Sequence, residues 1–530
     1  MKMKKILAIM LAVVMLAALA ACSNGDDKTP DNSVTGSPDH TGTGGPGENV
    51  QVADTVRILL EAPIASLDTL NAASAGNGPR AIYRCIMDKL VGITPQGVYT
   101  PELATSWSTN DDINYTFNLR NDVYFHNGQK FTAQDVINTV ELAQAAVGTN
   151  AHTAYKDIVS ITAPDEYTVE IVLRAVNVDF MYNLTNPCAA ILCKAAIDAD
   201  PVKGAWVGTG AFTVTGFSSG DYVTLTRNDN YWGEPAVSQT LQFNFVPENA
   251  ARVIMLQNGE THLVTGGIDV EHMPTIENAP DKYTIYSVIA NLGFGIMFNT
   301  NNPVTGDKNF RAAVTYAINV PEAAWVGAEK WAYLPVSGAF WGNSTEFLNT
   351  SLPIRNQDVE LAKQYLAESS YNGEQVEIMS GTEASVTCAV LIAEQMRAIG
   401  INVLLTNTDF ISIASTDTQG NSETQMINNL APFTLRASSS RGVYHTEGGT
   451  NRGKFSNPEM DRMLDQASSI TDDAEREALY MQLQQMFYDE YLGIMLFHRD
   501  MPLIATAHLR GLIIDPEMNH DFRYMYVELG

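Results

Sequence analysis

Apolar and polar residues alternate along several segments after residue 55, and this period of two predicts β-strands. The clearest alternation covers residues 115–120, a second covers residues 167–173, and a shorter one lies at residues 223–225. Such a pattern places the apolar side chains on one face of a strand and the polar side chains on the other. The segments lie far apart in the sequence, so they predict several half-buried strands separated by other elements.

Apolar residues at helical spacing predict three helices further along the chain. One apolar stripe runs over residues 310–318, a second helix is expected over residues 385–399, and a third over residues 473–490. Gly400 is expected to end the second helix, because glycine readily adopts the left-handed conformation at a helix C-terminus. Alternation resumes at residues 401–405. Strands and helices are therefore mixed along the chain, which predicts an α/β fold without an internal repeat.

The N-terminus has a different pattern, a continuous apolar run at residues 6–21 that follows three lysines. A run of 16 residues is too short for a membrane-spanning helix but fits an export signal. It ends in the tetrapeptide LAAC at residues 19–22, which resembles the lipobox of bacterial lipoproteins. We therefore expect residues 1–21 to be a lipoprotein signal peptide and Cys22 to carry the lipid.

Residues 22–53 are mostly Gly, Ser, Thr, Asp, Asn and Pro, and are expected to form a disordered tether. The rest of the chain has the composition and length of a globular protein with two or three sub-domains. The formal net charge of −28 opposes binding to nucleic acid and to anionic lipid. Contact with the membrane is therefore expected only through the N-terminal lipid.

Candidate catalytic and metal-binding patterns are weak in this sequence. Residues 216–220 match G-x-S-x-G, but both flanks read as strands, so a hairpin turn is expected there instead of a nucleophilic Ser218. His445 and Glu447 lack a second histidine at metal-ligand spacing and are interpreted as part of a solvated loop. We expect no enzyme activity, no cofactor and no metal site.

Four cysteines remain after Cys22, too few for a disulfide scaffold. Cys188 and Cys193 lie five positions apart. On a strand they would point to opposite faces at a separation of about 16 Å, which disfavours a disulfide between them but leaves it open.

Several short motifs follow one another in a fixed order along the body of the chain. They are SLD at residues 66–68, PELATSW at 101–107, YTFNLR at 115–120, FHNGQKFTAQDV at 125–136, GTGAF at 208–212, RNDNYW at 227–232, FNT at 298–300, FRAA at 310–313 and NPEMD at 457–461. In this order they resemble the motifs of the extracytoplasmic solute-binding proteins of family 5, the oligopeptide, dipeptide and nickel receptors of ABC importers.

These motifs predict local structure more directly than they predict a ligand. Asn127 and Gly128 lie between apolar residues and predict a hairpin with a primed turn. Thr132 and Asp135 have the spacing of an N-cap and its third helical residue, an acidic relative of the capping box. The aromatic residues Trp107, Tyr231 and Trp232 are expected to be packing anchors.

The resemblance implies a two-lobed fold like that of periplasmic binding proteins, of class II and of the large type with three sub-domains. Lobe I would comprise residues 54–90, 206–291 and 498–530, with a sub-domain inserted at residues 91–205. Lobe II would comprise residues 292–497. The chain would cross between the lobes near residues 291 and 498, and a solute would bind in the cleft between the lobes.

The resemblance also implies where ligand contacts should lie. We expect them at seven residues, namely Glu61, Ile64, Phe294, Trp341, Asn428, Asn429 and Arg436. Peptide receptors of the family carry a Trp and an Asp after the strand that corresponds to residues 425–430, whereas this chain has neither at residues 425–433. Arg436 suits recognition of an anionic group, and pairing with local acids is the alternative.

We therefore expect a monomeric, lipid-anchored substrate-binding component of an ABC importer on the extracytoplasmic face of the bacterial cell membrane. It would capture a small solute, such as a peptide, a modified peptide, a sugar or an opine-like molecule, and deliver it to permease subunits. A surface sensor, or an enzyme that retains the same scaffold, is the alternative, because a fold does not fix a function.

Overall fold

The computed structural model describes residues 50–60, 62–71, 77–94, 97–266, 268, 272–287, 289–328, 331–381, 383–408, 426–432, 434–500, 502–515 and 520–529. The predicted signal peptide, Cys22 and nearly all of the tether lie outside the described residues. None of the helices in this described part is long and apolar enough to cross a membrane.

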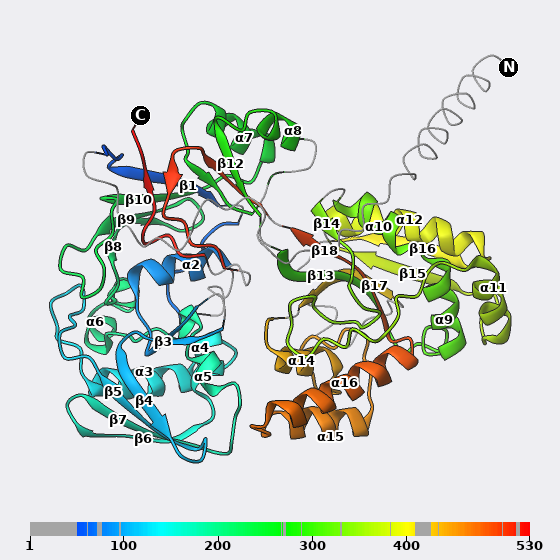
Figure 1. Cartoon of the computed structure of the whole chain (residues 1–530), viewed down its shortest axis with the longest axis horizontal. Helices are drawn as coiled ribbons and strands as arrows, with labels where there is room; N and C mark the ends of the chain where they lie inside the picture. Colours follow the sequence, from blue (N-terminus) through cyan, green and yellow to red (C-terminus); the bar gives the residue numbers. More distant parts are fainter. Residues whose placement is uncertain are drawn as a thin grey trace. The chain divides into compact units, whose positions relative to one another are not determined.

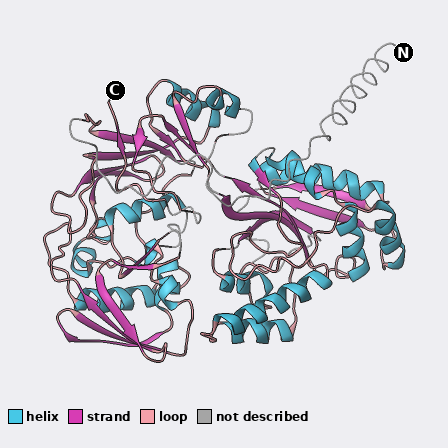
Figure 2. Ribbon diagram, in the orientation of Figure 1, coloured by secondary structure: helices cyan, strands magenta, loops and turns pink. Residues whose placement is uncertain are grey.

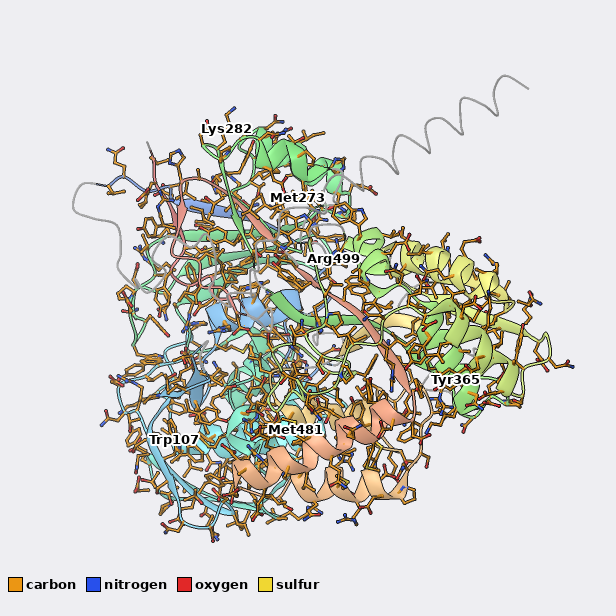
Figure 3. All side chains as sticks on the ribbon, turned by 45° about the vertical axis from the view of Figure 1, so that its right-hand side comes forward. Trp107, Met273, Lys282, Tyr365, Met481 and Arg499 are labelled. Carbon is orange, nitrogen blue, oxygen red and sulfur yellow. The ribbon has the colours of Figure 1, made fainter. Side chains whose placement is uncertain are left out.

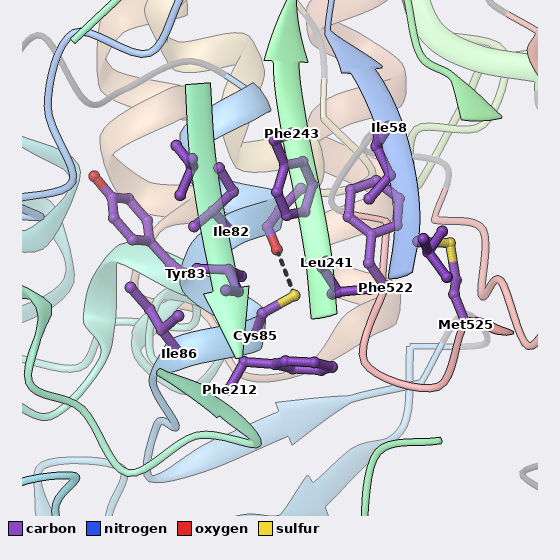
Figure 4. Close-up of a cluster of buried hydrophobic side chains, with 14 of the residues drawn as sticks. Ile58, Ile82, Tyr83, Cys85, Ile86, Phe212, Leu241, Phe243, Phe522 and Met525 are labelled. Carbon is purple, nitrogen blue, oxygen red and sulfur yellow. Dashed lines mark hydrogen bonds between the residues drawn. The ribbon is translucent and has the colours of Figure 1, made fainter. Parts of the chain in front are cut away.

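A seven-stranded sheet forms the first region (Figure 1), with strand order β12-β19-β11-β1-β10-β9-β8. Its strands are β1 (Thr55–Leu60), β8 (Phe212–Ser218), β9 (Tyr222–Arg227), β10 (Thr240–Phe245), β11 (Leu263–Val264), β12 (Tyr283–Tyr286) and β19 (Leu503–Thr506). Helix α2 (Asn77–Ile86) packs on it, and Ile58, Tyr83, Phe243 and Phe522 belong to the shared core (Figure 4). The C-terminal segment thus helps to complete the first core.

A four-stranded antiparallel sheet lies between β2 (Val91–Ile93) and β8 in the sequence, with strand order β4-β5-β7-β6. Its strands are β4 (Ala104–Thr109), β5 (Asn114–Leu119), β6 (Ile158–Asp165) and β7 (Thr168–Leu173). Helices α3 (Ala133–Ala145) and α4 (Asn150–Tyr155) contribute to its core. Trp107 belongs to β4 and packs against this core (Figure 3), as expected of a packing anchor.

A six-stranded sheet forms the third region, with strand order β14-β18-β13-β17-β15-β16. Its strands are β13 (Ile289–Phe298), β14 (Ala332–Tyr333), β15 (Gln375–Ser380), β16 (Asn402–Asn407), β17 (Met426–Pro432) and β18 (Gly493–Asp500). Its first core includes residues of α9 (Lys308–Ala317), α10 (Val320–Ala328) and α12 (Glu383–Ala398), which Figure 2 shows among the helices of this region. A second core includes residues of α15 (Pro458–Ala467) and α16 (Asp473–Asp489).

The chain passes twice between the seven-stranded and six-stranded sheets. It leaves β12 at Tyr286 and enters β13 at Ile289, and it returns from β18 at Asp500 to β19 at Leu503. The strands are neighbours at both ends, because β12 pairs with β19 and β13 pairs with β18. Two adjacent, short connections therefore join the sheets. The expected crossing points, residues 291 and 498, lie within β13 and β18, a few residues from these connections.

Most local predictions from the sequence are confirmed. The strand, helix and hairpin segments occur as β5, β7, β9, β16, α9, α12, α16 and the β8–β9 hairpin. Gly400 has a φ of +100°, as expected for the residue that ends α12. The capping box of α3 joins Thr132 and Asp135.

The predicted turn type at Asn127 and Gly128 is wrong. A primed turn requires two central residues with positive φ, whereas Gly128 alone among the turn residues has one, at +84°. Phe125 accepts a hydrogen bond from Gly128 N, and Phe125 N donates to Gln129 O. This arrangement fits a three-residue loop in which the glycine occupies the left-handed position.

Two of the sequence motifs, GTGAF and RNDNYW, meet around the buried carboxylate of Asp88. Thr209 Oγ1 and Trp232 Nε1 donate to its Oδ2 at 2.9 and 2.8 Å, and Tyr231 OH donates to its Oδ1 at 3.1 Å. The guanidinium of Arg523 lies 3.9 Å away. A buried carboxylate is costly unless such partners satisfy it, so this network fixes segments from the N-terminal, central and C-terminal parts of the chain. It confirms Tyr231 and Trp232 as structural anchors.

Candidate ligand-binding site

The loop after β1 is held by the β8–β9 hairpin. Gly220 N donates to Ile64 O at 2.9 Å, and Ser219 Oγ donates to Ala65 O at 2.9 Å. The positive φ of Gly220, +77°, permits the turn that brings these two donors to the loop. The side chain of Ile64 is buried in the first core, and Glu61 lies outside the described residues.

A shallow surface hollow lies beside this loop. The hollow is lined by Leu60, Ile64, Ser218, Asp221, Tyr222, Val223, Phe243, Asn244 and Phe245. β1 and β10 are parallel, and both end at this edge of the sheet. Ligands of α/β proteins commonly bind beyond the carboxyl ends of parallel strands, so a part of a solute could contact this edge.

On the six-stranded sheet, Asn428 and Asn429 lie within β17, opposite Ile296 and Gly295 of β13. The structure describes their backbone positions only. Phe294 of β13 is buried, and its ring stacks on Phe497 with centroids 4.8 Å apart. Its placement is that of a core residue, which disfavours contact with a solute.

Trp341 also belongs to a hydrophobic core. Its side chain is 1% exposed and contacts Tyr444 and Tyr480, and its Nε1 donates to Glu346 O at 3.1 Å. The placement favours packing over stacking on a sugar or a peptide. By contrast, Trp325 of α10 is 62% exposed.

Arg436 lies in a cluster of charged and aromatic side chains. Its Nε donates to Asp179 Oδ1 at 3.2 Å, its Nη1 donates to Glu346 Oε1, and its guanidinium lies 5.7 Å from the ring centre of Tyr182. Burial alone would lower the pKa of Arg436, but the carboxylates of Glu346 and Asp179 raise it above its ordinary value. The cation is thus already paired with two acids. Glu346 belongs to the same region as Arg436, and Asp179 comes from the region that precedes β8.

A second polar cluster lies where the chain passes between the sheets. The buried carboxylate of Asp500 accepts a hydrogen bond from Ser287 Oγ, and Tyr333 OH lies 3.5 Å from the same oxygen. His498 lies two residues earlier on β18 and is fully buried, and within the described part of the chain neither of its ring nitrogens has a hydrogen-bond partner. Burial lowers the pKa of His498 to about 4, so the imidazole is neutral near pH 7.

The structure corrects the interpretation of His445 as part of a solvated loop. The side chain is buried, and its Nε2 lies 3.5 Å from Asp465 Oδ1. No group of three or more His, Cys, Asp or Glu side chains with metal-ligand geometry occurs within the described ranges. Cys85, Cys188, Cys193 and Cys388 are free thiols, so the open alternative of a bridge between Cys188 and Cys193 is not realised.

Sequence reasoning missed Asp179, Glu346, His498 and Asp500. Asp179 and Arg436 are 257 positions apart, and no local pattern links them. Asp500 and His498 did carry a signal, because they follow the apolar residues at the end of the same strand and are buried. Buried polar side chains of this kind mark a functional or structural polar contact.

Comparison with known proteins decides the family. The profile of bacterial extracellular solute-binding proteins, family 5, matches residues 98–451. The chain belongs to this family. The nickel-binding periplasmic protein of Escherichia coli K12 is 24% identical to it over 462 residues, covering 81% of this chain and 87% of that protein.

Solved structures of similar proteins share the fold. The ABC transporter substrate-binding protein CtaP of Listeria monocytogenes superposes with a TM-score of 0.80 at 19% identity, covering 90% of this chain and all of that one. The periplasmic binding protein DppA of Helicobacter pylori, in complex with the peptide STSA, superposes with a TM-score of 0.75 at 23% identity, covering 90% and 98%. The α/β architecture of periplasmic binding proteins expected from the sequence is thereby confirmed.

Proposed function

We propose that this protein is the lipid-anchored substrate-binding component of an ABC importer. In this proposal Cys22 holds the protein at the extracytoplasmic face of the membrane, and the tether at residues 22–53 lets the folded body reach the permease. The body captures a small polar solute between lobe I and lobe II, with the boundaries given above. Membership of the family and the names of the similar proteins support a role in solute binding.

The observation that carries the proposal is the pair of short connections between the two large sheets. Hinges are a few residues at the ends of elements that absorb backbone rotation while the elements stay rigid. The connections after Tyr286 and Asp500 lie side by side, because the flanking strands pair with each other. Rotation about them would move one sheet against the other without breaking either core. A solute that contacts both lobes would favour closure.

The solute is proposed to be one that does not rely on a carboxylate to bind a peptide α-ammonium. The sequence of β17 includes Asn428 and Asn429, and a neutral amide forms a weaker contact to a cation than a carboxylate does. An ammonium group enclosed without a countercharge would lose several kcal/mol of solvation, on the order estimated for a buried ion. A peptide with a blocked N-terminus, a sugar or an opine-like molecule avoids this cost.

The test begins with the solute that copurifies. The protein is isolated under native conditions, denatured, and the released small molecules are identified by mass spectrometry. A stoichiometric small polar solute is expected, and its binding to the refolded protein is then measured by calorimetry. Release of no molecule, together with no binding of any tested solute, would contradict the proposed function.

A second measurement addresses the ammonium group alone. Calorimetry compares a mixed library of di- to pentapeptides with the same library after N-acetylation. We expect no submicromolar binding that depends on the free amine. Submicromolar binding that disappears on N-acetylation would show that another acid binds the ammonium, and Glu61 is the first residue to replace in that case.

A further inference from the structure

The ion pair between Arg436 and Asp179 joins two regions of the chain that have separate cores. Asp179 directly precedes α5 (Phe180–Asn183), in the segment between β7 and β8, and α5 contributes to the core of the four-stranded sheet. Arg436 follows β17 of the six-stranded sheet. A second contact links the same two regions, because Val178 N donates a hydrogen bond to Ser468 O at 3.2 Å. The contact therefore connects the expected inserted sub-domain, residues 91–205, with lobe II.

The two carboxylates around Arg436 are held in different ways. Glu346 belongs to the same region as Arg436, since its Oε2 accepts from Ala437 N at 3.2 Å and its N donates to Leu435 O at 2.9 Å. Glu346 therefore stays beside Arg436 whatever the position of the sub-domain. Asp179 belongs to the other region, whose segment is linked here through the hydrogen bond from Val178 to Ser468, and its side chain makes no capping hydrogen bond to α5. It would leave Arg436 if the two regions moved apart.

The charge balance of the cluster opposes a further anion. Arg436 contributes one positive charge, Glu346 and Asp179 contribute two negative charges within hydrogen-bond distance, and the neighbouring Arg476 is paired with Asp473. The side chains of Arg436 and Asp179 are 18% and 16% exposed, so water screens their interaction only in part. A carboxylate of a solute would have to displace Asp179 or add a third negative charge to the cluster.

We propose that Asp179 is an internal anion that occupies Arg436, fastens the sub-domain at residues 91–205 to lobe II and excludes anionic groups of a solute from this position. This proposal rests on the proposed function for its second part, since only a solute-binding protein has a solute to exclude. It makes Asp179 a residue that determines specificity, although it contacts no solute. Of the two alternatives for Arg436, the proposal takes pairing with acids of the chain over recognition of an anionic group of the solute.

The fastening is tested without any ligand. Spin labels are attached to cysteines introduced at Val159 of β6 and Val390 of α12, which are exposed, in the mature chain carrying Cys22→Ser. Double electron–electron resonance then measures the distance distribution in solute-free protein. Asp179→Asn keeps the shape of the side chain and removes its charge. We expect the population with the contact formed to fall on the order of ten-fold relative to the separated population, from the usual strength of a charged hydrogen bond.

A matched control and a second variant isolate the ion pair. Asp198→Asn removes an aspartate of the same sub-domain that pairs with Lys194 at the surface, and the distance distribution should stay unchanged. The double variant Asp179→Asn/Arg436→Gln should have the same distance distribution as Asp179→Asn, because the ion pair is already absent from the single variant. Sodium chloride at 0.5 M should shift the parent protein toward the Asp179→Asn distribution. An unchanged distribution in Asp179→Asn would overturn the fastening.

The exclusion is tested with succinate as the probe. Calorimetry should show no succinate binding to the parent protein and measurable binding to Asp179→Asn, lost again in Asp179→Asn/Arg436→Gln. Absence of succinate binding to Asp179→Asn would overturn the exclusion. Neither result depends on identifying the natural solute, so these failures are distinguishable from a failure of the proposed function, which the copurified solute tests.

Discussion

The imidazole of His126 reaches Gly210 across 84 positions of the sequence, with its Nε2 3.0 Å from the carbonyl oxygen of Gly210. Gly208 N donates to the other ring nitrogen at 3.3 Å. Nδ1 is therefore the acceptor, and Nε2 carries the hydrogen that it donates to Gly210. Burial lowers the pKa of His126, which is consistent with a neutral ring in this position. The sequence motifs at residues 125–136 and 208–212 therefore contact each other in the structure.

Replacement of Gly210 should be strongly destabilising. A Cβ atom at Gly210 would lie 2.5 Å from Ile86 C and 2.6 Å from Cys85 O, which are backbone atoms that cannot move aside easily. We expect Gly210→Ala to lower the free energy of unfolding by about 3 kcal/mol, as overpacking does. Urea unfolding measures it. Gly449→Ala is the matched control, because no atom lies within 4 Å of its added Cβ, and equal stability of the two variants would contradict this prediction.

Acid should destabilise the protein through His498. Its folded pKa of about 4 lies below the ordinary value of 6.5 because the ring is buried. Between these values the unfolded chain binds a proton that the folded chain does not, so stability is complete above about pH 6.5 and falls as the pH drops toward 4. His498→Leu should reduce the slope of unfolding free energy against pH in this window by about 1.4 kcal/mol per pH unit.

The pH experiment has an internal comparison in His520. Burial lowers the pKa of His520 to about 4 as well and also lowers the pKa of His126 and His262, so His498→Leu should remove only one of several such contributions. His508→Gln, at an exposed position, controls for the loss of an imidazole. A slope in His498→Leu equal to that of the parent protein would show that the ring is protonated in the folded state.

Cys22 should decide membrane attachment. The motivation is the LAAC tetrapeptide at the end of an apolar run that is too short to span a bilayer. Cys22→Ser should move the protein from the membrane fraction to the soluble extracytoplasmic fraction. Persistence of the variant in the membrane fraction would refute lipid anchoring at this residue.

Binding of the copurified solute should make the folded body more compact. Closure about the connections after Tyr286 and Asp500 would bring the two large sheets together. Small-angle X-ray scattering should therefore give a smaller radius of gyration at saturating solute than without solute. An identical radius in both states would argue against closure, whatever the affinity.

Local structure was predictable where a few neighbouring residues determine it. The hairpin at Gly220, the cap at Thr132 and the end of α12 at Gly400 all follow from short-range backbone preferences. The turn at Asn127 was recognised, but its type was not, because the Asn-Gly pair is compatible with more than one loop length. His445 shows the same limit, since its burial depends on α14 (Ser440–Tyr444) and α15 packing around it.

The candidate site was predictable only in outline. The motifs identify the scaffold and locate β17 and Arg436, but the partner of Arg436 comes from a region 257 positions earlier. In the sequence alone, the aromatic rings of Trp341 and Phe294 are compatible with packing in a core and with contact to a ligand. The tertiary structure shows that both rings are buried. Long-range contacts of this kind are set by tertiary structure and not by sequence spacing.

The position of β19 has a consequence for how the protein is made. β19 lies between β11 and β12 in the seven-stranded sheet, yet it is contributed by residues 503–506 of a 530-residue chain. A nascent chain therefore cannot complete its first sheet until almost all of it has been synthesised, and contacts between such distant segments form slowly. A chain that ends before Leu503 leaves two strands without their shared neighbour, and exposed strand edges of this kind invite aggregation and proteolysis.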